Sequence, residues 1–482
     1  MKKQFLFNIL LLIILNVLIK PFWVFGIDRT VQNTVGSEAY GLYFALFNFS
    51  ILFNAFLDLG INNYNNRTIA QTPALISSQF PRIVFIKLLL GLVYMLLCLG
   101  MALAFGYSSN AFILLAILSI NQFLASFLLF LRSNISGLQM YFADSIISVT
   151  DRALMIILCS ILLWTNLINI EMNIKTFALL QTFAYAGTAL FAFAILIRKG
   201  GFSGFKNVPL FSMGLFRKTL PFALLALLMV VYNRADAVLL ERLLPNGAKA
   251  AGIYAQSYRI FDAINMVSVL FASLLLPMFA RLVAQKDDIR PLVSLSFSIL
   301  FSGTIILAVA LTYFNIPFLS TLYKDITPES NTVFIILVLS TIPVAMSYIF
   351  GTLLTADGRL FSLNLIAGAA LFLNLGLNFL LIPGFGVLGA AATAIISQFL
   401  VAIAQFIVCM RNYSLSFSRH IILSYILLVF SSIFIAFVVD VFSIHIVIKL
   451  MLSLMFSGVM VFVLKIVDLQ EIYSLIRSEI AH

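Results

Sequence analysis

The chain has 482 residues, of which 62% are hydrophobic and only 10% are charged, and its mean hydropathy is +1.11. This composition excludes a water-soluble globule, because too few polar residues remain to cover its surface. The formal net charge of +11 does not indicate nucleic-acid binding, because the sequence leaves no soluble domain to carry that function. We therefore expect a protein whose main solvent is lipid.

Apolar segments of membrane-spanning length follow one another along the chain. A helix needs about 20 apolar residues to cross about 30 Å of hydrocarbon. The sequence therefore predicts an all-α integral membrane protein with fourteen transmembrane helices. We place them at 5–27, 40–62, 83–105, 111–131, 143–165, 174–197, 219–241, 251–276, 292–314, 330–353, 361–382, 387–410, 421–440 and 446–465.

The basic residues of the connecting loops are unevenly distributed between the two sides. The side of Lys2 and Lys3 holds most of them, including Arg132, Arg281 and Arg359. The excess of Lys and Arg on one side predicts that this side is cytoplasmic. An even number of spans then places both termini in the cytoplasm.

The longest connection, 198–218, is rich in basic residues and glycine and is expected to join two halves. Two short motifs recur: Gly41-Leu42-Tyr43 matches Gly252-Ile253-Tyr254, and Ser136-Gly137-Leu138-Gln139 parallels Thr355-Ala356-Asp357-Gly358. Such internal similarity is typical of duplicated transporters. We predict two six-helix lobes with pseudo-twofold symmetry, at 1–200 and 215–412, followed by two additional helices in 418–482.

Motifs of enzymes are weak in this sequence. The three histidines, His420, His445 and His482, have no second ligand at metal-site spacing, so neither a catalytic metal nor another cofactor is expected. The segment 384–389 matches GxGxxG, but it lies between two expected spans, where a tight turn explains it better than nucleotide binding. We expect a protein that is not an enzyme.

Cations inside the expected spans are the strongest functional signal, because a charge at mid-membrane costs at least about 2.5–3.5 kcal/mol. Lys20, Arg234 and Arg259 all fall about 10–12 Å below the expected outer edge at 1.5 Å per residue. Three cations at one level predict a ring that binds a phosphate or diphosphate. Two alternatives stay open: Arg259 could neutralise Asp262, and Lys20 could extend to the interface.

Acidic and aromatic residues accompany these cations. Asp151 could form an ion pair with Lys20 or titrate as a coupling site. We expect structural ion pairs or coupling groups at Asp144, Asp151, Arg152, Asp236 and Asp262. Tyrosines at the same level either form an interfacial belt or stack on sugar rings; these candidates are Tyr43, Tyr232, Tyr254 and Tyr258.

Several motifs together resemble those of a known family. They are Ser37-Glu38-Ala39-Tyr40-Gly41-Leu42-Tyr43, Leu57-Asp58-Leu59-Gly60, the segment 233–236, Ala251-Gly252-Ile253-Tyr254 with Arg259, Pro277, and Leu380-Leu381-Ile382-Pro383 with Gly386 and Gly389. In these the chain resembles the bacterial oligosaccharide flippases of the superfamily that also contains multidrug and toxin extrusion carriers and the lipid II flippase. That family commonly shows an Asp-Arg pair in span 7, whereas here Arg234 precedes Asp236.

The resemblance implies a flippase of the bacterial inner membrane. Such a carrier moves undecaprenyl-diphosphate-linked oligosaccharide repeat units to the periplasmic leaflet, by alternating access, for O-antigen, lipopolysaccharide or capsule synthesis. It implies a lipid-linked oligosaccharide as partner, with the glycan polymerase machinery as a further candidate, and H⁺ or Na⁺ as a coupling ion. The alternatives are a multidrug antiporter, a lipid II flippase, or a membrane-embedded glycan polymerase or ligase.

Overall fold

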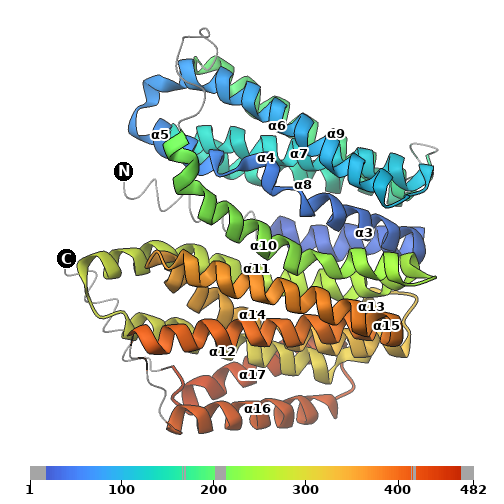
Figure 1. The fold of residues 1–482 in the computed structure, drawn as a ribbon. Coiled ribbons are helices and arrows are strands. Elements are labelled where there is room, and N and C mark those ends of the chain that lie inside the picture. The colour runs from blue at the N-terminus through green and yellow to red at the C-terminus, as the bar shows by residue number, and fades with distance from the viewer. Residues whose placement is uncertain are drawn as a thin grey trace. The chain divides into compact units, whose positions relative to one another are not determined.

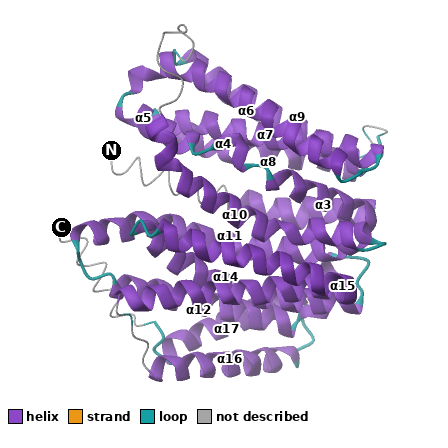
Figure 2. Ribbon diagram, in the orientation of Figure 1, coloured by secondary structure: helices purple, strands orange, loops and turns teal. Residues whose placement is uncertain are grey.

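The chain folds into helices joined by short connections, as Figure 2 shows. The computed structural model describes residues 18–165, 167, 170–200, 213–413, 415 and 419–467, with only the backbone described at 63, 64, 67, 213–222 and 419. Every regular element in these described ranges is a helix. This confirms the predicted all-α class.

Two compact units divide the chain, one comprising Met1–Gly252 and the other Ile253–His482. The first, unit 1, contains η1 (Phe22–Asp28), α2 (Arg29–Val35), α3 (Ser37–Leu52), α4 (Ala55–Asp58), α5 (Ile61–Gln71), η2 (Pro73–Leu75), α6 (Ile76–Ala104), α7 (Ser109–Gly137), α8 (Tyr141–Trp164), α9 (Ile174–Arg198) and α10 (Met213–Leu243). The long helix α11 (Gly247–Gln285) begins in unit 1 and continues into the second.

The second unit, unit 2, contains α12 (Arg290–Tyr313), α13 (Asn315–Leu322), α14 (Pro328–Ala356), α15 (Leu360–Tyr413), α16 (Arg419–Asp440) and α17 (Ile446–Val463). Its core lies around α12 and α14. In the apolar stretch of 18 residues that defines each of these spans, 56% and 61% of the residues are buried. The corresponding stretches of α16 and α17 are only 22% and 28% buried, so most of the surface of these helices faces away from the core of the unit.

Eleven described helical segments are long and apolar enough to span a bilayer. One of them, α15, has 54 residues, which at 1.5 Å each exceeds twice the hydrocarbon thickness, and Gly386 interrupts its helical geometry. It therefore covers two predicted spans, and the GxGxxG segment is the turn between them. Large apolar side chains such as Phe361, Phe372 and Leu380 are exposed, as expected for a lipid-facing surface. The chain is a multi-pass membrane protein.

The second predicted span differs from expectation, and the first is largely untested. Most of the span predicted at 5–27 lies outside the described residues, as do Lys2, Lys3 and residues 201–212 of the predicted linker. The span predicted at 40–62 is not one helix, because the backbone breaks after α3 and again at Leu59 and Gly60, where φ is positive. The total of fourteen spans and the division into lobes near 198–218 stay predictions.

A helix with the same length and the same type of start and end occurs in both units. Helices α7 and α14 each have 29 residues, and their starting positions differ by 219. Ser108 and Thr327, also 219 apart, each accept a hydrogen bond from the backbone N–H three residues later. The recurring motif at 136–139 and 355–358 thus lies where two helices of equal length end.

The turns that end these two helices also match. Gln139 and Gly358 both have positive φ, 59° and 72°. The backbone N–H groups of 138, 139 and 140 bond to the carbonyls of 134, 136 and 135, and those of 357, 358 and 359 bond to 353, 355 and 354. Each set closes its helix in the manner of a Schellman turn.

Within unit 1, α7 packs between α6 and α9, and the three helices lie side by side (Figure 1). Their contact surface includes the buried side chains of Phe80, Phe130 and Leu196. This packing fixes the positions of α7, α8 and α9, which carry most of the charged residues described below.

The first residues of the recurring motif, Gly41 and Gly252, are in contact inside unit 1. A Cβ atom on Gly41 of α3 would overlap the carbonyl of Ala248 and the backbone nitrogen of Gly252 at the start of α11. A Cβ atom on Gly252 would overlap the carbonyl of Ser37. The two backbones therefore touch where the motif occurs in each repeat, and only glycine fits.

We predict that Gly41→Ala destabilises the protein, because the added methyl group forces the two backbones apart at a cost of about 1–3 kcal/mol. The measurement is the thermal midpoint of the purified protein in detergent, followed by size-exclusion chromatography.

The matched control is Gly100→Ala on α6, where a Cβ atom would meet open space. Alanine there should leave the midpoint unchanged or raise it, because it favours the helix by about 0.5–1 kcal/mol. Equal midpoints for the two variants would contradict the close contact.

Candidate functional site

A small polar cavity lies within unit 1, between α7, α8 and α9. Its volume is about 180 Å³. It is lined by Ala125, Leu128, Leu129, Arg132, Ile147, Ser148, Asp151, Arg152 and Tyr185. At about 30 Å³ per water molecule it has room for roughly six waters, well below the ~300–1,000 Å³ of a typical small-molecule pocket. The cavity can therefore hold a compact group such as a phosphate.

Arg152 of α8 has the most contacts of the charged groups in this cavity. Its Nη1 donates a hydrogen bond of 3.0 Å to the hydroxyl of Tyr185 on α9. Its guanidinium lies 5.4 Å from the ring centroid of Trp23 and 5.6 Å from that of Tyr185, within the range of cation–π attraction. Asp151 is a loose ionic partner, with 3.9 Å between its Oδ2 and the Arg152 Nε.

Trp23 is held in place by the local backbone around Pro21. A proline has no N–H and crowds the preceding turn, and here the chain continues as the π-helical segment η1. Within η1, Trp23 is buried and stacks on Phe177 of α9, with 6.0 Å between ring centroids and 4° between planes.

Lys20 precedes this proline and is half-buried. Its charged neighbours are Arg152, Asp151 and Arg132, so the predicted proximity of Lys20 and Asp151 is found. Among the described residues, however, Lys20 has no carboxylate within 4.0 Å, so the direct ion pair considered from the sequence does not form. Its ammonium group is therefore available to an anion.

Arg132 was expected in a loop but lies inside the last two turns of α7. Its Nε and Nη2 donate to the two carboxylate oxygens of Asp144 on α8, at 2.7 and 3.3 Å. Such a forked contact is among the strongest ionic pairings. Because α7 and α8 form a hairpin around Gln139, residues at similar distances on either side of the turn face each other, and this spacing could have predicted the pair.

Three cations and two carboxylates thus gather in one part of unit 1. Asp144 is occupied by Arg132, and Asp151 lies beside Arg152. The remaining positive charge is that of Lys20, and the aromatic rings of Trp23 and Tyr185 lie beside the Arg152 guanidinium. This arrangement can bind a small dianion by charge and by the planar fork of the guanidinium group.

The other predicted cations are not among the residues that line this cavity. Arg234 is half-buried on α10 in unit 1, and Asp236 two residues later is buried. Arg259 and Asp262 are half-buried on the part of α11 that belongs to unit 2. A ring shared by Lys20, Arg234 and Arg259 therefore stays a prediction.

The predicted sugar-binding tyrosines are all buried. The Tyr43 ring packs against Tyr40, Phe47 and Phe177, and its hydroxyl accepts a hydrogen bond of 2.7 Å from Gln181 Nε2. The exposed fraction is at most 5% for the remaining three, Tyr232, Tyr254 and Tyr258. Their role in a sugar path stays a prediction.

Two further polar contacts of unit 1 were not expected from the sequence. Asp28, in η1, is buried and accepts a hydrogen bond of 2.7 Å from the Tyr40 hydroxyl. Lys87, in the middle of α6, is buried and pairs with Asp58. Lys87 lies inside the span predicted at 83–105, where a lone charge is the signal that could have indicated a buried partner. Asp28 lies one residue beyond the span predicted at 5–27 and beside Arg29, as an ordinary interfacial residue would.

Within the part of the chain that the structure describes, His, Cys, Asp and Glu side chains form no group that could hold a metal ion. The possible use of H⁺ or Na⁺ as a coupling ion stays a prediction.

Solved structures share this fold over most of their length. A multidrug resistance MATE family transporter of the MOP superfamily, in an inward-facing conformation, aligns with a TM-score of 0.64 and 14% identity, over 81% of this chain and 94% of that one. The lipid II flippase MurJ, in an inward closed conformation, aligns with a TM-score of 0.66 and 14% identity, over 93% and 98%. A MOP superfamily transporter from Pyrococcus furiosus, whose binding pocket has reversed polarity, aligns with a TM-score of 0.61 and 15% identity, over 84% and 94%.

The fold is therefore that of the MOP superfamily transporters. The family model described as polysaccharide biosynthesis protein matches residues 6–283, more than half of the chain, so the protein belongs to that family. No protein with a curated description matches the sequence.

We predict that Arg152 controls the fluorescence of Trp23. The chain has only two tryptophans, and Trp164 is 55% exposed whereas Trp23 is 9% exposed. In a Trp164→Phe background, Arg152→Met should shift the Trp23 emission, because it removes a charge 5.4 Å from the ring. In a Trp23→Phe background the same substitution should leave the Trp164 emission unchanged; a shift of both tryptophans would indicate general unfolding instead.

Proposed function

We propose that this protein is a flippase that moves undecaprenyl-diphosphate-linked oligosaccharide repeat units from the cytoplasmic to the periplasmic leaflet of a bacterial inner membrane. Three findings support this proposal: the polysaccharide biosynthesis family, the transporter fold, and the basic cavity of unit 1. Of these findings, the cavity supports the proposal most strongly, because it offers positive charge at a depth where lipid surrounds the protein. The excess of basic loop residues on one side supports cytoplasmic termini.

The diphosphate is the part of such a substrate that fits the cavity. A guanidinium group and an ammonium group bind phosphate oxygens by charge-assisted hydrogen bonds. Lys20 has no ionic partner among the residues that the structure describes, and the 3.9 Å separation of Arg152 and Asp151 is easily exchanged for a phosphate contact. The volume of about 180 Å³ leaves the sugars and the lipid outside this cavity.

Translocation is proposed to follow alternating access. Lys20 and Arg152 first bind the diphosphate, and Arg234 and Arg259 complete its site as the two lobes rock about their connection. The lipid tail stays in the bilayer throughout, so only the head group has to be shielded from hydrocarbon. The tyrosines Tyr43, Tyr232, Tyr254 and Tyr258 are the proposed contacts of the sugars.

The alternative of a multidrug antiporter requires a site for organic cations. Beside this cavity, Arg152 already lies against the rings of Trp23 and Tyr185, which could otherwise stack on such a cation. A cationic drug would have to displace a tethered positive charge. The basic cavity therefore favours an anionic head group.

The proposed function is tested by deleting the gene and analysing the lipid-linked intermediates of the host. We expect single repeat units to accumulate on the cytoplasmic leaflet, because their synthesis continues while their transfer stops. Accumulation of single units on the periplasmic leaflet would indicate a polymerase. Loss of dye export with normal glycans would indicate a drug carrier, and accumulation of lipid II would indicate a lipid II flippase.

We predict that Lys20→Gln weakens binding of undecaprenyl diphosphate to the purified protein in nanodiscs by roughly ten- to a hundredfold. A hydrogen bond to a charged group is worth about 1.5–3 kcal/mol, which corresponds to that range. Binding is measured by native mass spectrometry.

Lys199→Gln is the matched control, because Lys199 is an exposed cation outside this cavity. It should bind the diphosphate lipid like the unmodified protein. Equal losses in both variants would show that Lys20 contributes only general positive charge.

A further inference from the structure

A second, open cavity of unit 1 lies where three helices begin or end. Its volume is about 520 Å³, which is larger than that of the cavity beside Arg152. Sites for small organic molecules commonly have volumes of ~300–1,000 Å³. The start of α6, the turn between α7 and α8 and the end of α9 form its walls, which include Ile76, Ser77, Leu138, Met140, Lys199 and Gly200. This cavity can therefore hold a group larger than a phosphate.

The cavity lies at one edge of the apolar surface of unit 1. Phe142, just after the turn between α7 and α8, and Ile197, near the end of α9, are large apolar side chains that are exposed. On α6, Phe85 is likewise exposed, about 14 Å from Ile76 along the helix axis. Exposed apolar residues of a multi-pass protein face lipid. The cavity therefore lies at the boundary between hydrocarbon and water, on the side whose basic loops predict the cytoplasm.

The floor of this cavity is apolar, and its rim carries a positive charge. Ile76 is buried and packs with Leu138 and Met140 in one apolar cluster. Lys199 on the rim is exposed, and among the described residues it has no carboxylate within 4.0 Å. None of the described lining residues is acidic. Apolar surface beside a cation matches the boundary between the acyl chains and the phosphate of an anionic lipid.

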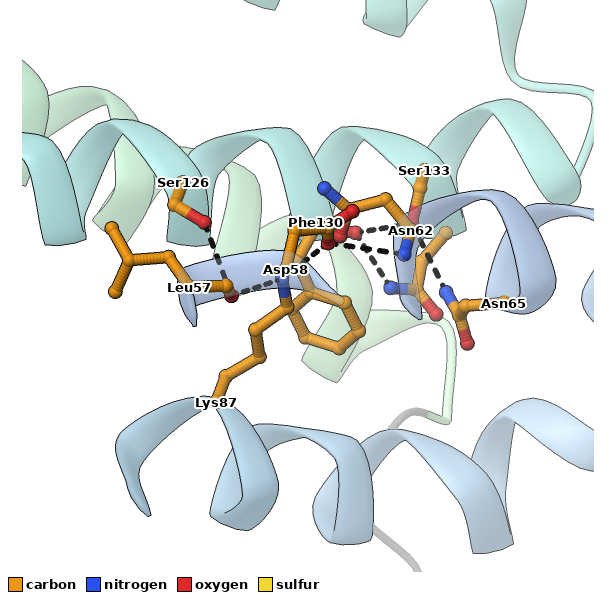
Figure 3. Close-up of polar contacts among 9 residues, drawn as sticks. Leu57, Asp58, Asn62, Asn65, Lys87, Ser126, Phe130 and Ser133 are labelled. Atoms are coloured by element: carbon orange, nitrogen blue, oxygen red, sulfur yellow. Dashed lines mark hydrogen bonds and ion pairs between the residues drawn. The ribbon is translucent and has the colours of Figure 1, made fainter. Parts of the chain in front are cut away.

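Contacts outside the cavity hold the wall that precedes α6. Asn65 of α5 donates a hydrogen bond of 3.1 Å to the hydroxyl of Ser133 on α7 (Figure 3). Near the end of α7 the two helices are so close that a Cβ atom on Gly137 would lie 3.1 Å from the carbonyl oxygen of Asn66. Helix α5 is thus fixed against α7, and η2, which follows α5 in the chain, lines the cavity. A ligand does not have to order this wall, which lowers the free-energy cost of binding.

The wall at the end of α9 is held by its own turn. Gly200 has φ of 86°, a conformation that favours glycine, and its N–H donates a hydrogen bond of 3.0 Å to the carbonyl of Ile197. The N–H of Lys199 donates to the carbonyls of Ile195 and Leu196. The backbone of Lys199 is therefore fixed at the rim, and its ammonium group supplies three N–H donors to an anion.

The charge of the rim selects among the head groups of membrane lipids. Lys199 is the one charged residue among the described residues that line the cavity, so a single phosphodiester group balances it. A zwitterionic head group brings a second positive charge close to Lys199, and like charges repel. A glycerol head group has hydroxyls instead, which can donate hydrogen bonds to carbonyl groups at the ends of α7 and α9. These features favour a lipid with one phosphate and an uncharged polar head group.

We propose that this cavity binds the head group of a monoanionic glycerophospholipid of the phosphatidylglycerol class. Lys199 binds the phosphate, the glycerol contacts the ends of α7 and α9, and the acyl chains lie along the exposed side chains of Phe142 and Ile197. The bound lipid connects the start of α6 to the end of α9, where the predicted connection 198–218 begins. This site is distinct from the one proposed for the diphosphate, so the inference does not depend on the transported substrate.

The experiment measures lipid binding to the purified full chain in detergent by native mass spectrometry. Phosphatidylglycerol is titrated, and phosphatidylcholine and phosphatidylethanolamine serve as zwitterionic references. We expect Lys199→Gln to weaken the tightest binding of phosphatidylglycerol by roughly five- to tenfold, because it removes the cation of the site, and Lys199→Arg to retain that binding. Phosphatidylglycerol should also raise the thermal midpoint of the unmodified protein more than that of Lys199→Gln.

Ala74→Trp tests the cavity separately from its charge. Ala74 lines the cavity and is exposed, so a large side chain there occupies the space of the head group without disturbing the core. This variant should weaken the binding of phosphatidylglycerol as Lys199→Gln does. An excess of glycerol 3-phosphate should not displace the lipid, because this soluble anion lacks the acyl chains.

The matched control is Lys286→Gln. Lys286 is an exposed lysine just beyond the end of α11, on the same predicted side of the membrane, and it does not line the cavity. This variant should bind phosphatidylglycerol like the unmodified protein. Unchanged binding in Lys199→Gln, an equal loss in Lys286→Gln, equal binding of the zwitterionic lipids, or displacement by glycerol 3-phosphate would each overturn the inference. None of these results concerns undecaprenyl diphosphate, so the proposed function keeps its own test.

Discussion

Lipid does not hydrate a charged side chain, and this constraint organises the polar contacts in the membrane-spanning helices of unit 1. Arg132 is held by both oxygens of Asp144, Arg152 by Tyr185 and the face of Trp23, and Lys87 by Asp58 and a backbone carbonyl. Each of these contacts joins different helices. The charges therefore fix how α6, α7, α8 and η1 pack, in addition to any role in binding.

Against this background, a cation without a matching carboxylate among the described residues supports the proposed function. Lys20 has Asp151 among its charged neighbours but forms no ion pair with the described residues. The cavity beside it is too small for an oligosaccharide, which is consistent with a site that recognises only the charged link between lipid and sugar. One such site could serve glycans of different composition, because the sugars would be bound elsewhere.

The sequence predicted the helical class and most spans, because long apolar segments in a bilayer have few alternatives to a helix. It did not predict the break at Leu59 and Gly60, because hydropathy is insensitive to backbone geometry and Asp58 has its partner Lys87 on another helix. The depth of residues along the helices grouped Lys20 with Arg234 and Arg259, which stays a prediction. The proximity of Lys20 and Asp151 was considered separately, and the contact of Arg152 with Trp23 was not foreseen. The partnership of Arg132 and Asp144 was not found, because the predicted span ended one residue before Arg132.

The helices α7 and α14, which have the same length, tolerate few changes in that length. A helix of 29 residues is about 44 Å long, which matches the hydrocarbon and both head-group layers together. Because successive side chains are rotated by about 100°, one inserted residue in α7 would turn every later side chain away from its neighbour. The two helices have equal lengths although their sequences differ, as this limit requires.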